Sequence, residues 1–128
     1  MTTTPPAPLL DLQVIQEIVG VTADSEGTFM VQLLQTFVSD AHDALARMQH
    51  HAHAGDSAAL AREAHRLKGS SGTVGATQLA GECRAIEHTA RAGSCAGLDS
   101  SIEQARQVLD ATRVRIAEFF RGTIATAT

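Results

Sequence analysis

The residues best suited to chemistry gather in one stretch, residues 64–76, with the sequence AHRLKGSSGTVGA. On a helical wheel of about 100° per residue, His65 points away from the apolar positions, so its imidazole is expected to be exposed. Lys68 follows one helical turn later, where its ammonium would stabilise an anion arriving at His65. Because neutral imidazole is a nucleophile near pH 7, this pair favours chemistry on an anionic group such as a phosphoryl group.

The residues expected beside His65 on the same strip of helix have small or basic side chains. The presence of Gly69 inside a helix has to be explained, because glycine lowers helix stability by roughly 1 kcal/mol relative to alanine. Access is a physical reason, since a residue without a Cβ lets a bulky partner approach the imidazole closely. The expected binding surface consists of Ala58, Ala61, Arg62, Arg66, Gly69, Ser70 and Gly72. Its arginines, on a chain of net charge −4, suit a phosphate group or an acidic docking partner.

The elements that must position these residues are all helical. The three prolines lie at positions 5, 6 and 8, and the remaining sequence is proline-free and rich in alanine, which favours helix. Apolar residues recur at helical spacing in a short segment at about 9–19 and in four longer segments at about 25–53, 57–74, 76–92 and 98–121. Short loops separate the four longer segments. The sequence therefore predicts an all-α fold, an antiparallel four-helix bundle with a short extra N-terminal helix.

The length of 128 residues suits one domain, and an apolar content of 44% is enough for a single core. We expect a flexible tail at residues 1–8, the helical bundle at 9–121 and a second flexible tail at 122–128. The Met1 start and the short tails favour a free-standing protein.

Composition argues against several classes of protein. The net charge of −4 argues against a nucleic-acid binder, and an aromatic content of 3% argues against a base-stacking surface. No apolar run reaches the length of a membrane span, and no signal peptide is evident. The two cysteines are too few for a disulfide scaffold and indicate a reducing, cytoplasmic setting. Cys83 falls on an apolar stripe and is expected in the core, whereas Cys95 lies in a Gly/Ser loop and is expected to be exposed.

The stretch around His65 resembles the signature of histidine-containing phosphotransfer (HPt) domains. HRLKGSS at 65–71, followed by VGA at 74–76, matches the family pattern of His, any residue, Leu, Lys, Gly, small residues and an apolar-Gly-Ala turn. The specific match spans about residues 61–87. The resemblance implies a helical bundle that carries a phosphoryl group on histidine in a two-component phosphorelay. Such a carrier accepts the group from the aspartate of one receiver domain and passes it to the aspartate of another.

The resemblance also implies roles for single residues. His65 falls at the phosphoacceptor position, and Lys68 falls at the position that neutralises the phosphoryl oxygens. Gly69 falls at the position that leaves room beside the imidazole. Ser70 and Ser71 match the small residues that follow.

Glu87 stands where some family members have a glutamine that hydrogen-bonds the histidine ring. A carboxylate at this place can accept from Nδ1–H and so leave Nε2 free to attack. In the alternative interpretation, Glu87 is a solvated charge that pairs with Arg84 or Arg91.

The resemblance implies that the partners are receiver domains of response regulators or of a hybrid sensor histidine kinase, with the Mg²⁺ ion on the receiver. Residues 69–75 are glycine-rich but lack the Gly-Lys-Ser/Thr end of a Walker A motif. We therefore expect no ATP site, no autokinase activity and no cofactor in this chain. A monomer that binds neither nucleic acid nor membrane is expected.

Two alternatives remain open. His50 and His53 have the spacing to share a metal ion, with His51 and Asp56 nearby, although histidines are also favourable at an exposed helix C-terminus. A metal-binding bundle would need inward Glu and His side chains, whereas the inward stripes here are aliphatic, so no metal site is expected. The other alternative is a helical interaction module without phosphotransfer activity.

Overall fold

The computed structural model describes residues 9–11, 13–15, 17 and 28–127, and for 28–31 and 119–127 it describes the backbone alone. Residues 13–15 and 17 are helical. The main helices are α2 (Thr28–His53), α3 (Ser57–Thr73), α4 (Thr77–Arg91) and α5 (Leu98–Ala127). The described part of the chain contains no strand, which confirms the all-α prediction.

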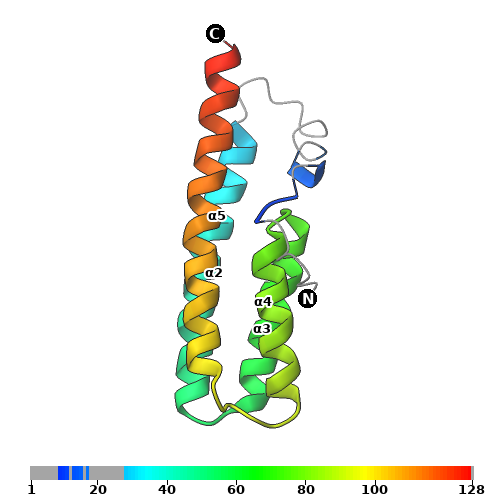
Figure 1. The fold of residues 1–128 in the computed structure, drawn as a ribbon, viewed down its shortest axis with the longest axis vertical. Helices are drawn as coiled ribbons and strands as arrows, with labels where there is room; N and C mark the ends of the chain where they lie inside the picture. Colours follow the sequence, from blue (N-terminus) through cyan, green and yellow to red (C-terminus); the bar gives the residue numbers. More distant parts are fainter. Residues whose placement is uncertain (1–8, 12, 16, 18–27, 128) are drawn as a thin grey trace, which may run out of the picture.

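The four helices form an antiparallel bundle (Figure 1). α2 packs against α3 and α5, and α4 packs against the same two helices, so that the helices surround one core. α3 and α4 are the shorter pair, and α2 and α5 extend beyond them at one end (Figure 1). None of the described helices is both long and apolar enough to cross a membrane.

The apolar face of α3 lies in the core, as its periodicity predicts. Leu60, Ala64, Leu67 and Ser71 are buried, as is Val74 directly after the helix. Facing them are buried side chains of the other three helices, among them Leu45, Met48, Leu79, Ile86, Ile102 and Leu109. Because this face is buried, the opposite face of α3 is fixed toward solvent.

The ends of α3 are set by local interactions. At the N-terminus the Asp56 carboxylate accepts a hydrogen bond from the Ala59 amide at 3.1 Å, which is an N-cap. Beyond the C-terminus Gly75 has a φ of 81°, a left-handed conformation that favours glycine. A Cβ there would lie 3.0 Å from the Asp11 carbonyl oxygen. The Gly75 carbonyl accepts from the Asp11 amide at 2.7 Å, so the turn also anchors the N-terminal segment.

The structure differs from the sequence prediction at the C-terminus. Residues 122–128 were expected to form a tail, but the backbone of α5 is helical through Ala127. Residues 121–127 contain no proline, and the single glycine there lowers helix propensity without ending a helix. The expected tail at 1–8 and most of the expected helix at 9–19 lie outside the described residues.

Candidate functional site

His65 lies in α3 on the solvent side, and 61% of its side chain is exposed. Its neighbours Ala64 and Leu67 are buried in the core, so the helix that carries the imidazole is firmly seated. Among the described residues, only the Nδ1 nitrogen of the ring has a hydrogen-bond partner. The Nε2 nitrogen is therefore free to meet an incoming group.

The partner of Nδ1 is Glu87 of α4, whose side chain is only 8% exposed. Glu87 Oε2 lies 2.9 Å from His65 Nδ1, and Glu87 Oε1 accepts from Lys68 Nζ at 2.7 Å. Arg91 also donates to Oε2, at 2.7 Å. The structure thus contains the predicted contact between Glu87 and the ring, together with the alternative pairing of Glu87 with Arg91. No ion pair to Arg84 occurs in the described part of the chain.

These contacts determine which ring nitrogen carries the proton. The ammonium of Lys68, with further donation from Arg91 and His65, lowers the pKa of Glu87 to about 2, although burial of the carboxyl acts in the opposite direction. Glu87 is therefore ionised near neutral pH and can only accept hydrogen bonds. The hydrogen atom in its contact with His65 must be on Nδ1. In the neutral imidazole this leaves the lone pair on Nε2.

Most of the predicted binding surface is exposed around His65: Ala58, Arg62, Arg66, Gly69, Ser70 and Gly72. A Cβ at Gly69 or Gly72 would meet no atom within 4 Å, so packing inside the protein does not require either glycine. The prediction for Ala61 was wrong, since this residue is 5% exposed. A helical wheel treats α3 alone, whereas in the bundle Ala61 lies at a shallow hollow whose other wall includes Ala90 of α4.

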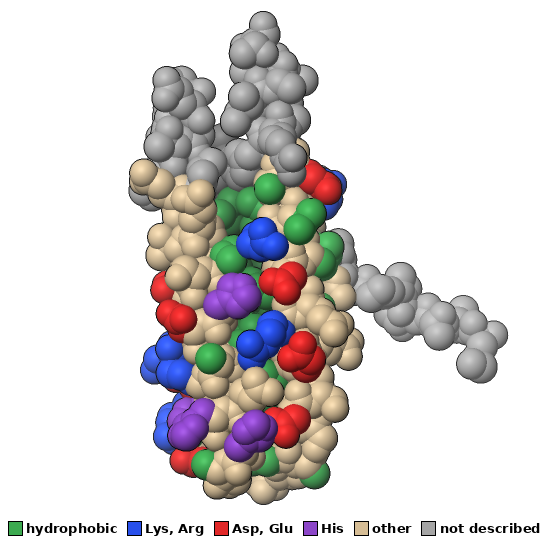
Figure 2. Space-filling view, turned by 90° about the vertical axis from the view of Figure 1, so that its left-hand side faces the viewer, with side chains coloured by type: hydrophobic (Ala, Val, Ile, Leu, Met, Phe, Trp, Pro, Cys, Tyr) green, Lys and Arg blue, Asp and Glu red, His purple; other side chains and the backbone are tan. Residues whose placement is uncertain are grey.

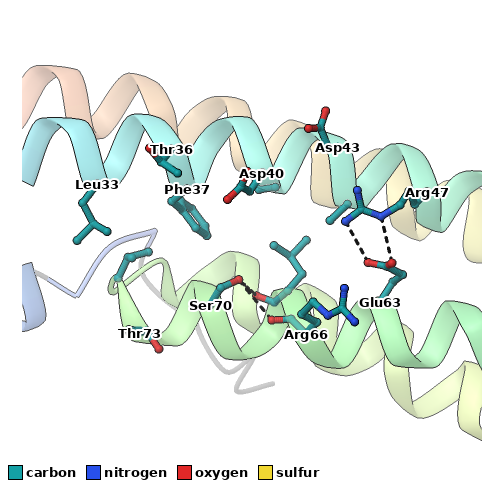
Figure 3. A pocket seen from close by; sticks show the side chains of 14 residues that line it. Leu33, Thr36, Phe37, Asp40, Asp43, Arg47, Glu63, Arg66, Ser70 and Thr73 are labelled. Atoms are coloured by element: carbon teal, nitrogen blue, oxygen red, sulfur yellow. Dashed lines mark hydrogen bonds and ion pairs between the residues drawn. The ribbon is translucent and has the colours of Figure 1, made fainter.

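A groove between α2 and α3 borders the predicted surface on the side away from α4 (Figure 3). Its apolar lining includes Phe37 of α2 and Leu67 of α3. Arg66 also lines it, from α3. Arg47 and Glu63 form an ion pair of 3.0 Å across it (Figure 3). Sequence reasoning missed this groove because it depends on how two helices pack, although Arg66 and Ser70, two exposed residues of α3 that line it, were identified.

The histidines at the end of α2 contact neighbouring side chains. His53 Nε2 lies 3.0 Å from Asp99 Oδ1 of α5, and the rings of His50 and His51 meet edge to face at 5.9 Å. On the face formed by α2 and α5, histidines lie beside acidic side chains (Figure 2). Within the residues that the structure describes, no three or more His, Cys, Asp or Glu side chains are grouped to hold a metal ion.

Comparisons with known proteins agree with this geometry. The family model of the Hpt domain matches residues 32–115, a range that includes His65, Lys68 and Glu87. Among solved structures, histidine-containing phosphotransfer protein B from Pseudomonas aeruginosa PAO1 is similar, with 34% sequence identity and a TM-score of 0.79. That similarity covers 90% of this chain and 96% of the other. A comparison with curated proteins gave no match.

Proposed function

Because this chain belongs to the Hpt domain family of phosphorelay carriers, we propose that His65 is its phosphoacceptor and that Nε2 is the attacking atom. The observation that carries this proposal is the exposed imidazole whose Nδ1 is held by a buried carboxylate at 2.9 Å. Such a ring presents a lone pair to solvent and is kept from rotating away.

In the proposed reaction, the Nε2 lone pair attacks the phosphorus of an aspartyl phosphate on a receiver domain. The N–P bond forms as the P–O bond to the aspartate breaks, and the aspartate leaves as a carboxylate. The proton on Nδ1 stays in place, so the phosphorylated ring carries a positive charge beside the negative Glu87. Passing the group to a second receiver reverses these steps. Phosphoryl transfer depends on in-line positioning and charge stabilisation, and this arrangement contributes to both.

Lys68 lies one helical turn from His65, and it binds the same carboxylate, Glu87, as the His65 ring. We assign Lys68 the role of binding the phosphoryl oxygens, because its ammonium group would stabilise their negative charge. In the structure its Nζ is bound to Glu87, and 29% of its side chain is exposed, so it is held near the ring and accessible to a partner.

The docking face for the receiver is the exposed strip of α3 around Gly69, with Arg62 and Arg66 as its basic residues. Hpt proteins work with receiver domains or kinases, and we propose receivers of response regulators or of a hybrid sensor kinase as the partners here. Magnesium would then belong to the receiver. Three further properties stay predictions: that the carrier is cytoplasmic, that it is a monomer and that it has no autokinase activity.

The test of the proposal is transfer from a phosphorylated receiver domain, with ³²P as the label. We expect wild type to be labelled and His65→Gln to remain unlabelled. His88→Gln is the matched control, because His88 is an exposed histidine of α4 and should be labelled like wild type. Equal labelling of His65→Gln and wild type would overturn the assignment.

A second experiment tests Lys68. Lys68→Ala should slow transfer or shorten the lifetime of the phosphohistidine, because one charge near the phosphoryl oxygens is lost. Circular dichroism should show an unchanged helix content. If both the transfer rate and the lifetime equal those of wild type, Lys68 does not act on the phosphoryl group.

A further inference from the structure

Glu87 is bound by two cations, although one would suffice to neutralise it. Lys68 Nζ binds Oε1 at 2.7 Å, and Arg91 donates to Oε2 at 2.7 Å. Oε2 is also the oxygen that contacts His65 Nδ1 at 2.9 Å. Each oxygen of the carboxylate therefore has a cationic donor, and Arg91 shares its oxygen with the imidazole.

The two cations differ in what else they have to do. Under the proposed function, Lys68 binds the phosphoryl oxygens during transfer and leaves Oε1. A buried carboxylate without a partner is unfavourable, so a Glu87 held by Lys68 alone would move with the ammonium or turn to water. Arg91 lies on the same helix as Glu87, one turn on, so its contact does not depend on the position of Lys68.

We propose that Arg91 is a positioning residue for phosphotransfer, which holds Glu87 against Nδ1 of His65 while Lys68 turns to the phosphoryl group. The inference rests on the proposed function of His65 and Lys68. During transfer the hydrogen bond from Lys68 Nζ to Glu87 is exchanged for one to a phosphoryl oxygen. The Arg91 and Nδ1 hydrogen bonds to Oε2 persist, and no proton changes place.

An alternative role for Arg91 is direct contact with the incoming partner, because 60% of its side chain is exposed. The two roles make different predictions when Glu87 is replaced by glutamine. A neutral amide can accept from Nδ1–H through its oxygen without a cation beside it. In the Glu87→Gln background, replacing Arg91 should no longer slow phosphorylation of His65 if Arg91 acts through Glu87. It should still slow phosphorylation if Arg91 contacts the donor.

The first test needs no phosphodonor, because Lys68→Ala imitates the departure of Lys68. The ¹⁵N chemical shifts of the His65 ring show which nitrogen carries the proton, at a pH above the ordinary titration range of imidazole. We expect Nδ1–H to be retained in Lys68→Ala and lost to a mixture of tautomers in Lys68→Ala/Arg91→Gln. Lys68→Ala/Arg84→Gln is the matched control and should keep Nδ1–H, since Arg84 is an exposed arginine of the same helix.

Two outcomes of this test would overturn the proposal. If Lys68→Ala alone loses the Nδ1–H preference, Arg91 cannot hold Glu87 by itself. If the Lys68→Ala/Arg91→Gln variant keeps the preference, Arg91 is not needed to hold it.

The second test is kinetic and uses phosphoramidate, a small donor whose N–P bond breaks with loss of ammonia. Arg91→Gln should slow phosphorylation of His65 by about tenfold, as expected for loss of one charge-assisted hydrogen bond, and Arg91→Lys should restore most of the rate. In the Glu87→Gln background, adding Arg91→Gln should change the rate by less than about twofold.

An equal slowing by Arg91→Gln in both backgrounds would mean that Arg91 acts on the donor directly, and the proposal would fail. Unchanged rates in Arg91→Gln would also contradict it, while leaving His65 as the phosphoacceptor. Labelling of His65→Gln by the receiver would instead contradict the proposed function, so the two failures are distinguishable.

Discussion

At the scale of single residues, Glu87 determines how His65 is presented. It is a buried acid that contacts the ring, Lys68 and Arg91 at once. These donors stabilise the charged form of the carboxylate, so the contact with Nδ1 is a charge-assisted hydrogen bond. A glutamine at this position could make the contact with the ring but would not need the two cations. The site is therefore a set of four side chains that depend on one another.

The lowered pKa of Glu87 predicts how stability depends on pH. A group whose pKa falls from 4.5 to about 2 on folding contributes stability that is fully present above about pH 4.5. This contribution is lost as the pH falls toward 2. In urea unfolding, the free energy of unfolding of wild type should therefore fall between about pH 5 and 2 by about 2–3 kcal/mol more than that of Glu87→Gln.

Glu82→Gln serves as the control for this prediction, because it removes another carboxyl from α4. It should follow the pH dependence of wild type. If Glu87→Gln and wild type lose stability in parallel, the contacts of Glu87 do not stabilise the folded protein in the way the geometry indicates.

At the scale of the element, α3 combines a packed face with an open one. The packed face places the helix, while on the open face Gly69 and Gly72 leave space that no described atom fills. Glycine inside a helix lowers the stability of the helix, and no packing contact at Gly69 or Gly72 requires a glycine there. Under the proposed function, this open face is the surface that the receiver domain approaches.

Substitutions at Gly69 separate stability from access. Gly69→Ala should raise the free energy of unfolding by about 1 kcal/mol, because alanine is the better helix former and its Cβ meets nothing. Gly69→Gln should keep the helix content and slow transfer from a receiver severalfold, with little effect on phosphorylation by phosphoramidate. These outcomes can be measured by urea unfolding and by transfer kinetics.

Gly81→Gln is the matched control, since Gly81 is an exposed glycine of α4 with equally open surroundings. It should not slow transfer from the receiver. Unchanged receiver kinetics in Gly69→Gln would show that the glycine does not provide access.

At the scale of the whole molecule, four helices share one core, and a residue's chemistry depends on whether it faces that core. Cys83 of α4 is fully buried, and burial raises the pKa of its thiol to about 12. Cys95, in the loop before α5, is half-buried rather than exposed as the sequence suggested. The two thiols should therefore differ in reactivity.

A thiol-reactive dye checks this difference. At pH 8 the native protein should react quickly at one thiol per chain, Cys95, and at both thiols after unfolding in urea. Cys95→Ser should then show no fast reaction until it is unfolded. Fast reaction of Cys83 in native Cys95→Ser would mean that the core opens readily around α4.

Much of this protein could be predicted from its sequence because the decisive patterns are local. Apolar residues at helical spacing predicted the helices, and the buried face of α3 follows from that spacing. The exposure of His65 and its closeness to Lys68 follow from the geometry of one helix. The burial of Cys83 was predicted in the same way from the stripe of α4.

Other features depend on which helices meet, and only the packed bundle reveals them. The family resemblance predicted the contact between His65 and Glu87, and helical spacing allowed the pairing of Glu87 with Arg91. Only the packing of α4 on α3 shows that both contacts are made at once, by the same carboxylate oxygen. Ala61 is buried because a neighbouring helix flanks it, which no wheel of α3 can show. The groove beside α2 and the pairing of His53 with Asp99 have the same origin. A helix determines its own faces from its sequence, whereas the partner of each face is determined by packing.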